Sequence, residues 1–409
     1  MKAGVDMKVA FWIELKNIEG INLENLENGN PGIGGTEYMF LTLISELEKK
    51  KELEVFLFSD NTSNIPEKIN SVYTESFNSV IKYYNELNID ILIMRTSSDE
   101  AIYELISKNK IKTILWAHNF LPSYKIKKII ENESFIKKYI CVSKVQFEEL
   151  KNETISGKSD FIYNFLDFKN YKCTDNILNN NNNVVYIGSL IKGKGADILI
   201  KNWKYVLREV EDAKLHIIGG GNLYDRKVKL GERNLAEKTF EEKIFKEIEE
   251  NNLSKSIIFH GSMGMEKLNI MQQAKVGICN PSGKTETFGI TALEFQAMGI
   301  PVVAKRCIGY RDTVGNEISG VLINNEKELV YEICKLLKNK DYLIKLSKGG
   351  REFVEEKFKK DKIITKWINI FEEVENMEEK IILEKKVGKI SLLLIIKDIL
   401  KKVRNDVFG

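Results

Sequence analysis

Two glutamates at a fixed spacing give this sequence its clearest chemical signal. Glu286 and Glu294 bracket the segment ETFGITALE, which follows the apolar run AKVGICN (274–280) and opens the helix-like stretch FGITALEFQAM. A helix that begins near Phe288 would offer free amides and partial positive charge, which together bind a diphosphate. Glu286 would lie just before that site, and Glu294 about six residues inside the helix, roughly 9 Å along its axis. The two carboxylates would then accept hydrogen bonds from hydroxyls on either side of one diphosphate, as in a nucleotide sugar.

The same region contains a competing motif. SGKT (282–285) looks like the end of an ATP-binding phosphate loop, which needs glycine, four residues and then Gly-Lys-Ser/Thr. The required glycine position holds Ile278, and Gly277 stands one residue too early. The helical pattern also begins too late, so the ATPase interpretation is rejected. For the two glutamates alone, solvated carboxylates on a surface helix stay an equal alternative.

Three further loops place glycine or lysine where a phosphate would be held. GSLIKGKG (188–195) leads from a strand into a helix and carries Lys194, and HIIGGGNL ends a strand with three glycines. NPGIGGTE (30–37) puts Gly34 and Gly35 at the first strand–helix turn, where bare amides would approach the same phosphates from across a cleft. None of these loops is Gly-x-Gly-x-x-Gly, so a dinucleotide-dependent dehydrogenase is not supported.

Apolar runs that alternate with amphipathic stretches must position these loops. Continuous apolar strands separated by helices indicate parallel sheets covered on both faces. The polar stretch CTDNILNNNNN (173–183) interrupts the pattern and predicts a linker. We therefore predict an α/β protein with a domain over 1–172, a second domain over 184–365, and a closing helix and tail over 366–409. Two doubly wound domains facing each other bind a ligand at the carboxyl ends of their strands. The predicted strands are 8–14, 53–59, 89–95, 112–118, 138–143, 159–164, 184–189, 213–220, 256–262, 274–280, 300–305 and 319–324.

Length and charge narrow the class of protein. The 409 residues suit two domains rather than one core. The balance of 62 basic and 59 acidic residues argues against a nucleic-acid binder, which needs a basic stripe. The five cysteines are scattered and form no Cys-x-x-Cys pair, so neither a disulfide framework nor a zinc site is expected. No signal-peptide-like start or run of ~20 apolar residues is present, and we expect a cytoplasmic protein.

Together these segments resemble the retaining family 4 glycosyltransferases, which belong to the GT-B superfamily and to the glycosyl transferases group 1. The resemblance covers about residues 8 to 375 and includes GIGGTE, WAHN, YIGSLIKGKGADILIKNW, AKLHIIGGG and FHGS. Its most specific part is ETFGITALEFQAMGIPVVA, with two glutamates separated by seven residues, a Phe-Gly pair and the linked GIPVVA. The resemblance implies the GT-B fold, in which two Rossmann-like domains face a central cleft.

The resemblance also implies roles for matching residues. Glu286 would bind hydroxyls of the donor sugar, Glu294 would bind the ribose, and Lys194 would neutralise the diphosphate beside the amides of 288–290. His118, in WAHN, would lie near the donor sugar and the acceptor, although a lone histidine after a strand is more often structural. Residues after SIIFHG would contact the base. The expected catalytic residues are therefore His118, Glu286 and Lys194. The expected donor contacts are Gly34, Gly35, Ser189, Lys194, Gly219, Gly220, His260, Gly261, Glu286, Thr287, Phe288, Gly289, Ile290 and Glu294.

Two departures from the family pattern affect the charge around the diphosphate. Ser189 stands where the family often has arginine, with Lys192 as a candidate substitute. The family's GGxPE loop is IGYRDT here (308–313), with Arg311 as a candidate cation. The sequence contains no Asp-x-Asp motif, so we expect no metal and no cofactor. In the family, positioning and charge stabilisation drive a transfer in which a leaving phosphate oxygen takes the acceptor proton.

The expected activity is transfer of a hexose or N-acetylhexosamine from a nucleotide-diphosphate sugar, UDP-sugar favoured over GDP-sugar, to a glycan or lipid-linked acceptor. Its setting would be surface polysaccharide or glycolipid assembly. The basic amphipathic stretches 124–139 and 385–409 suit the inner face of a membrane, with packing against protein as the equal alternative. A catalytically silent GT-B protein that binds a partner glycosyltransferase is the alternative that Ser189 keeps open. Chain length disfavours a pyridoxal-phosphate-dependent GT-B phosphorylase.

Overall fold

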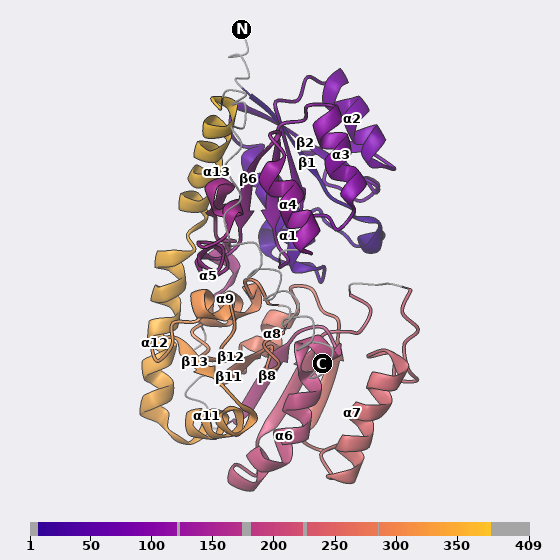
Figure 1. Ribbon diagram of the computed structural model, residues 1–409. Coiled ribbons are helices and arrows are strands. Elements are labelled where there is room, and N and C mark those ends of the chain that lie inside the picture. The colour runs from indigo at the N-terminus through magenta and orange to yellow at the C-terminus, as the bar shows by residue number, and fades with distance from the viewer. Residues whose placement is uncertain (1–6, 121–122, 174–180, 224–226, 285, 378–409) are drawn as a thin grey trace.

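The protein consists of two domains, each built on one parallel sheet (Figure 1). The computed structural model describes residues 7–120, 123–173, 181–223, 227–284 and 286–377. The first sheet has the order β3-β2-β1-β4-β5-β6-β7 and the second β10-β9-β8-β11-β12-β13. These sheets confirm the predicted α/β class and the GT-B architecture. The strands are β1 (Met7–Trp12), β2 (Leu53–Ser59), β3 (Asn70–Tyr73), β4 (Ile91–Arg95), β5 (Thr113–Ala117), β6 (Ile136–Cys141), β7 (Ser159–Phe161), β8 (Asn183–Ile187), β9 (Lys214–Ile218), β10 (Ile257–Gly261), β11 (Val276–Cys279), β12 (Val302–Lys305) and β13 (Gly320–Ile323).

Twelve of these strands coincide with predicted apolar runs, and β3 is the exception. The sequence of β3, NSVY, has one strongly apolar residue, and none of its four side chains is buried. It pairs only with β2 at the sheet edge, so no second neighbour selects for apolar side chains. In each sheet the strand order reverses beside the first strand, between β1 and β4 and between β8 and β11. Loops that diverge at such a point leave a crevice where ligands bind.

Helices cover both faces of each sheet. In the first domain α2, α3 and α4 pack on one face, while α1 and α13 pack on the other. In the second domain α6, α7 and α11 cover one face, and α8 and α9 cover the other. The helices are α1 (Gly35–Leu47), α2 (Phe77–Glu86), α3 (Glu100–Lys108), α4 (Tyr124–Asn132), α5 (Lys144–Glu148), α6 (Ala196–Glu209), α7 (Lys238–Glu250), α8 (Lys267–Met271), α9 (Ile290–Ala297), α10 (Tyr310–Thr313), α11 (Glu326–Lys338), α12 (Lys340–Lys357) and α13 (Lys360–Glu375).

The last helices lead the chain back to the first domain. α12 runs along the second domain, and α13 lies against the first (Figure 1). Trp367 of α13 is fully buried and packs edge-on against Trp116 of β5, with ring centroids 4.9 Å apart. Lys138 pairs with Glu373 at 2.6 Å, which adds a polar contact to the same interface. The boundary predicted at 365 therefore falls inside α13, which begins at Lys360 and belongs to the core of the first domain.

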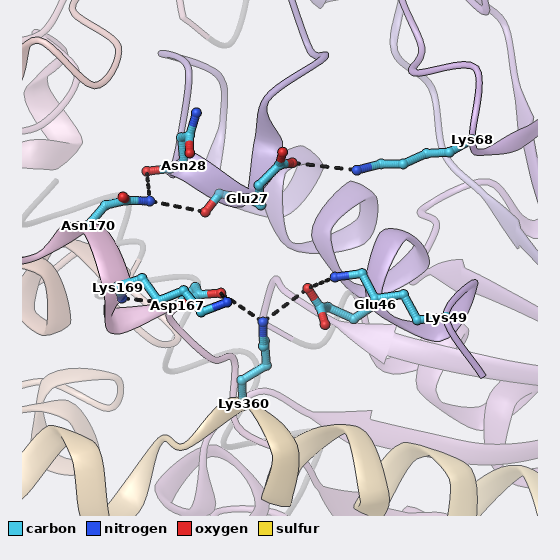
Figure 2. A network of polar contacts seen from close by, with 9 residues as sticks. All are labelled: Glu27, Asn28, Glu46, Lys49, Lys68, Asp167, Lys169, Asn170 and Lys360. Carbon is cyan, nitrogen blue, oxygen red and sulfur yellow. Dashed lines mark hydrogen bonds and ion pairs between the residues drawn. The ribbon is translucent and has the colours of Figure 1, made fainter.

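A polar network holds the connection between the domains (Figure 2). Lys360 donates to Asp167 at 2.7 Å and to Glu46 of α1 at 3.1 Å. Three residues further along the connection, the Asn170 amide donates to the carbonyl oxygens of Glu27 and Asn28, at 3.3 and 3.1 Å. The connection is thus fixed to the first domain before it reaches the second. Residues 174–180 of the predicted Asn-rich linker lie outside the described residues.

Candidate active site

A cavity of about 160 Å³ lies where loops of both domains meet. The first domain contributes the loop before α1, and the second contributes the carboxyl ends of β8, β9 and β10, the loop after β11 and the start of α9. Eight of the expected donor residues line this cavity. They are Gly35, Ser189, Lys194, Gly219, Gly220, Glu286, Ile290 and Glu294.

Lys194 and Glu286 face each other in the cavity. The Lys194 Nζ lies 2.9 Å from Glu286 Oε2, and both side chains are 14% exposed. Asn280 Nδ2 donates to the same oxygen at 3.2 Å. A 3-10 turn (Lys192–Lys194) after β8 carries the lysine, and Gly195 ends it with φ +73°. A side chain at Gly195 would collide with the Ser282 amide, so this glycine lets the two loops approach closely. The arrangement puts one cation and one hydrogen-bond acceptor at the same end of the cavity.

Glu294 lies at another wall of the cavity and is held by two donors. Its side chain is only 3% exposed. Lys267 Nζ donates to Oε1 at 2.7 Å, and the Tyr171 hydroxyl donates to the same oxygen at 2.8 Å. Lys267, at the start of α8, also lines the cavity, whereas Tyr171 reaches Glu294 from the connection between the domains.

Two helix N-termini approach each other at the cavity. A Cβ built on Gly35 in α1 would lie 3.9 Å from Ile290 in α9, and both residues line the cavity. Glycine occupies the N-cap of each helix, and neither helix has a side-chain cap. The first-turn amides are therefore not taken by a capping side chain, and the helix dipoles favour an anion here.

The glycine before α9 has a different role from the one expected. Helix α9 begins at Ile290 rather than near Phe288, and Gly289 is its N-cap with φ +84°. A Cβ at Gly289 would come within 2.3 Å of the Tyr310 ring. Packing of Tyr310 and a left-handed backbone thus require glycine here, and Gly289 does not line the cavity.

The lysines that line the cavity are not the residues that the sequence offered as replacements for the family's missing charges. Lys192 and Arg311 are exposed, and neither lines the cavity. The lysines that do are Lys194 and Lys267. Ser189 is buried, lines the cavity, and has a hydroxyl without a hydrogen-bond partner among the described residues. An unpaired buried hydroxyl is costly, so Ser189 is suited to contact a ligand.

His118 lies beside the cavity rather than in its wall. Its carbonyl oxygen accepts a hydrogen bond from Thr287 Oγ1 at 2.6 Å, which joins the end of β5 to the loop after Glu286. The imidazole packs against Trp116, with ring centroids 4.4 Å apart. Its Nε2 has no partner in the described part of the chain. Burial, with a smaller contribution from Arg95, lowers the pKa of His118 to about 3, so the ring is neutral near pH 7.

This pKa makes stability depend on pH in a specific direction. Between the ordinary value of 6.5 and about 3, the unfolded chain binds a proton at His118 and the folded protein does not, so stability falls as the pH drops. We expect His118→Gln to reduce the slope of the free energy of unfolding against pH by up to about 1.4 kcal/mol per pH unit. Urea unfolding from pH 6.5 to 4.5 measures this slope. An equal slope in both proteins would contradict a buried neutral His118.

The remaining expected residues lie outside the cavity wall. Phe288 is buried against Tyr163 and Phe358, and Gly34 is the N-cap of α1. The Gly261 carbonyl accepts from the Gly219 amide at 2.8 Å, which ties β10 to β9. The segment after β10 does reach the cavity, through Ser262 and Met263.

His216 in β9 lies beside His260 in β10 and is not part of the fully buried core. Its side chain is half-buried, and Nδ1 lies 3.0 Å from Nε2 of His260. The two rings stack with planes 9° apart on neighbouring strands, which directs His260 toward His216. Burial, with a smaller effect of His260, lowers the pKa of His216 to about 4.

Sequence reasoning missed four residues that shape the site. Asn280, Lys267 and Tyr310 line the cavity, and Tyr171 holds Glu294. Asn280 could have been predicted from the sequence, because it ends a predicted strand just before the loop that carries Glu286. Lys267 and Tyr171 belong to no sequence motif. They reach Glu294 only because α8 and the connection between the domains pack against α9.

The stretch 124–139, expected as a basic surface, has most of its lysines in ion pairs. Lys125 pairs with Glu100 at 2.5 Å, Lys128 with Glu131 at 2.8 Å, and Lys127 with Glu153. This pairing removes much of the positive charge that would attract anionic lipid. No helix in the described ranges is long and apolar enough to cross a membrane. The stretch 385–409 lies outside the described residues.

Comparison with known proteins agrees with this two-domain architecture. Residues 168–353 match the family model Glycosyl transferases group 1. An uncharacterised glycosyltransferase of Methanocaldococcus jannaschii is 28% identical over 295 residues, 71% of this chain and 70% of that protein. The poly(ribitol-phosphate) alpha-N-acetylglucosaminyltransferase of Staphylococcus aureus is 25% identical over 251 residues, 60% of this chain and 46% of that protein.

A solved structure also has the same fold. HepE of Anabaena in complex with UDP and glucose superposes with a TM-score of 0.69 at 14% identity, over 90% of this chain and 100% of that one. Fold and site thus define a two-domain GT-B protein. The family match, over residues 168–353, makes the second domain similar to those of the group 1 glycosyltransferases.

Proposed function

We propose that the chain is a retaining glycosyltransferase that moves a hexose or N-acetylhexosamine from a nucleotide-diphosphate sugar to a hydroxyl of a glycan or lipid-linked acceptor. The observation that carries the proposal is the cavity in which Lys194, Glu286, Glu294 and two helix N-termini converge. Complexes of the similar HepE with UDP and glucose support a UDP-sugar over a GDP-sugar. The name of the Staphylococcus aureus relative, a poly(ribitol-phosphate) alpha-N-acetylglucosaminyltransferase, supports transfer of an N-acetylhexosamine to a polymer. A setting in surface polysaccharide or glycolipid assembly is part of the proposal.

The chain's own residues suggest how transfer would proceed. Glu286 would orient the donor sugar, and Glu294 would hold the ribose. Lys194, with the helix N-termini, would stabilise the charge that develops as the anomeric carbon–phosphate oxygen bond breaks. The acceptor oxygen would bond to the same face of that carbon, and its proton would pass to the leaving phosphate oxygen. We propose that this requires no metal.

We assign the acceptor to the first domain, where a second cavity lies. It has a volume of about 390 Å³ and lies at the carboxyl ends of β1, β4 and β5. Trp12 and Phe120 give it apolar faces, while Arg95 and Asn119 give it polar groups. Asn119 adjoins His118, whose carbonyl contacts Thr287 beside Glu286, so the two cavities are neighbours. An aromatic and polar lining suits a sugar ring of an acceptor. His118, whose Nε2 has no partner among the described residues, would lie between the donor sugar and this acceptor.

Ligand-induced stabilisation tests the proposal. We expect UDP, or GDP if the base preference is wrong, to raise the melting temperature in EDTA, because a ligand at 100 times its Kd adds about 2.7 kcal/mol. ATP and NAD should have no effect, and Glu294→Gln should lose most of the shift. A shift that needs manganese would overturn metal independence. No shift with any nucleotide would favour a catalytically silent GT-B protein that binds a partner glycosyltransferase, the alternative that Ser189 keeps open.

A further inference from the structure

The buried carboxylate of Glu294 uses its two oxygens unequally. Both Tyr171 and Lys267 donate to Oε1. No described residue donates to Oε2, although the side chain lines the cavity. A carboxylate can accept about four hydrogen bonds, so Glu294 keeps capacity for a ligand while its position is fixed.

Both donors are suited to hold this position permanently. Tyr171 is 1% exposed, and burial, followed by the charge of Glu294, raises the pKa of Tyr171 well above its usual value. Its hydroxyl therefore remains a donor at any physiological pH. Lys267 is also buried and supplies the charge that a buried carboxylate requires.

The backbone of Tyr171 is itself fixed on both sides. Arg351 of α12 donates to the Tyr171 carbonyl oxygen and, at 2.7 Å, to that of Ala297 at the end of α9. Asn170 and Asp167 fix the preceding residues to the first domain (Figure 2). The Tyr171 hydroxyl is therefore aimed at Glu294 by contacts with both domains.

We propose that Tyr171 and Lys267 are positioning residues, which hold Glu294 by Oε1 so that Oε2 accepts hydrogen bonds from the ribose diol of the donor. The inference rests on the proposed function, because it takes Glu294 as the ribose-binding residue. It makes ribose recognition by Glu294 depend on a residue outside the cavity, Tyr171 in the connection between the domains.

The protein contains a matched control for this arrangement. The Tyr163 hydroxyl donates to Oδ1 of buried Asp312 at 3.0 Å, and Lys357 lies 3.4 Å from the same oxygen. This second tyrosine–carboxylate–lysine cluster also joins the domains, but none of its members lines the donor cavity. Tyr163→Phe therefore removes the same type of buried hydrogen bond away from the ligand.

The test compares the Kd values of UDP, 2′-deoxy-UDP and 3′-deoxy-UDP by calorimetry, with the guanosine series if GDP binds instead. We expect the parent protein to prefer the ribonucleotide about tenfold or more, as for a hydrogen bond to a charged group. In Tyr171→Phe this preference should fall severalfold, toward that of Glu294→Gln. Tyr163→Phe should retain it even if its melting temperature is lower.

The outcomes distinguish a failure of the positioning role from a failure of the proposed function. If Tyr171→Phe is folded and retains the full ribose preference, the positioning role is wrong while the donor site stands. If Tyr171→Phe does not fold, Lys267→Gln must lower the same preference, and an unchanged preference there overturns the inference. If the parent protein binds none of these nucleotides, the proposed function fails first and the inference with it.

Discussion

Lys194→Ala is expected to lower the turnover number about 100- to 1000-fold, because it removes a preorganised charge at the leaving group. The lysine lies in the cavity wall at 2.9 Å from Glu286, and its side chain is 14% exposed, so water replaces its charge poorly. The Kd for UDP should change much less than the turnover number, since part of the charge develops only as the bond breaks. Release of UDP from a UDP-sugar measures this, with an acceptor or as slow hydrolysis without one.

Lys192→Ala is the matched control for this prediction. Lys192 precedes Lys194 by two residues in the same 3-10 turn, but it is exposed and does not line the cavity. Its removal should leave turnover within about twofold of the parent, because an exposed charge is screened by solvent. Equal losses in both variants would mean that overall positive charge, rather than the position of Lys194, governs the reaction.

The sequence was sufficient for those parts of the structure that depend on local patterns. Twelve strands could be predicted because buried parallel strands are apolar on both faces. Strand β3 was not predicted because it is a short, exposed edge strand. Gly35, Lys194, Glu286 and Glu294 could be predicted to converge, since each lies in a loop after a strand or in the helix that follows such a loop. The spacing of Glu286 and Glu294 is visible in the sequence because both residues belong to one loop and the helix that follows it.

Features that depend on long-range packing could not be predicted in the same way. Tyr171 and Lys267 meet Glu294 across 123 and 27 residues of chain, and no local spacing records such contacts. The role of Gly289 depends on the Tyr310 ring, and the orientation of His260 depends on its neighbour His216. The start of α13 could not be predicted for a related reason, because the apolar face of α13 packs against β5, which lies more than 200 residues earlier in the chain.

The return of α13 to the first domain gives the second prediction. Trp367→Ala should reduce the free energy of unfolding of the first domain by about 3–5 kcal/mol, because it leaves a large cavity between α13 and β5. The Trp367 side chain is fully buried, and it packs against Trp116, which in turn contacts His118. Destabilisation should therefore be accompanied by loss of activity, although Trp367 lies outside both cavities.

Hydrogen exchange can assign this loss to one domain. In Trp367→Ala, amides of β1, β4 and β5 should exchange faster, whereas those of β8, β11 and β12 should keep most of their protection, because the second sheet has a separate core on its other face. Tyr331→Ala provides the control: this aromatic side chain in α11 is 62% exposed, so its removal should change stability by less than about 0.5 kcal/mol. Faster exchange confined to the second domain would show that α13 does not stabilise the first. Uniformly faster exchange in both sheets would instead mean that the two domains unfold as one cooperative unit, since the core around Trp367 continues from α1 into α9.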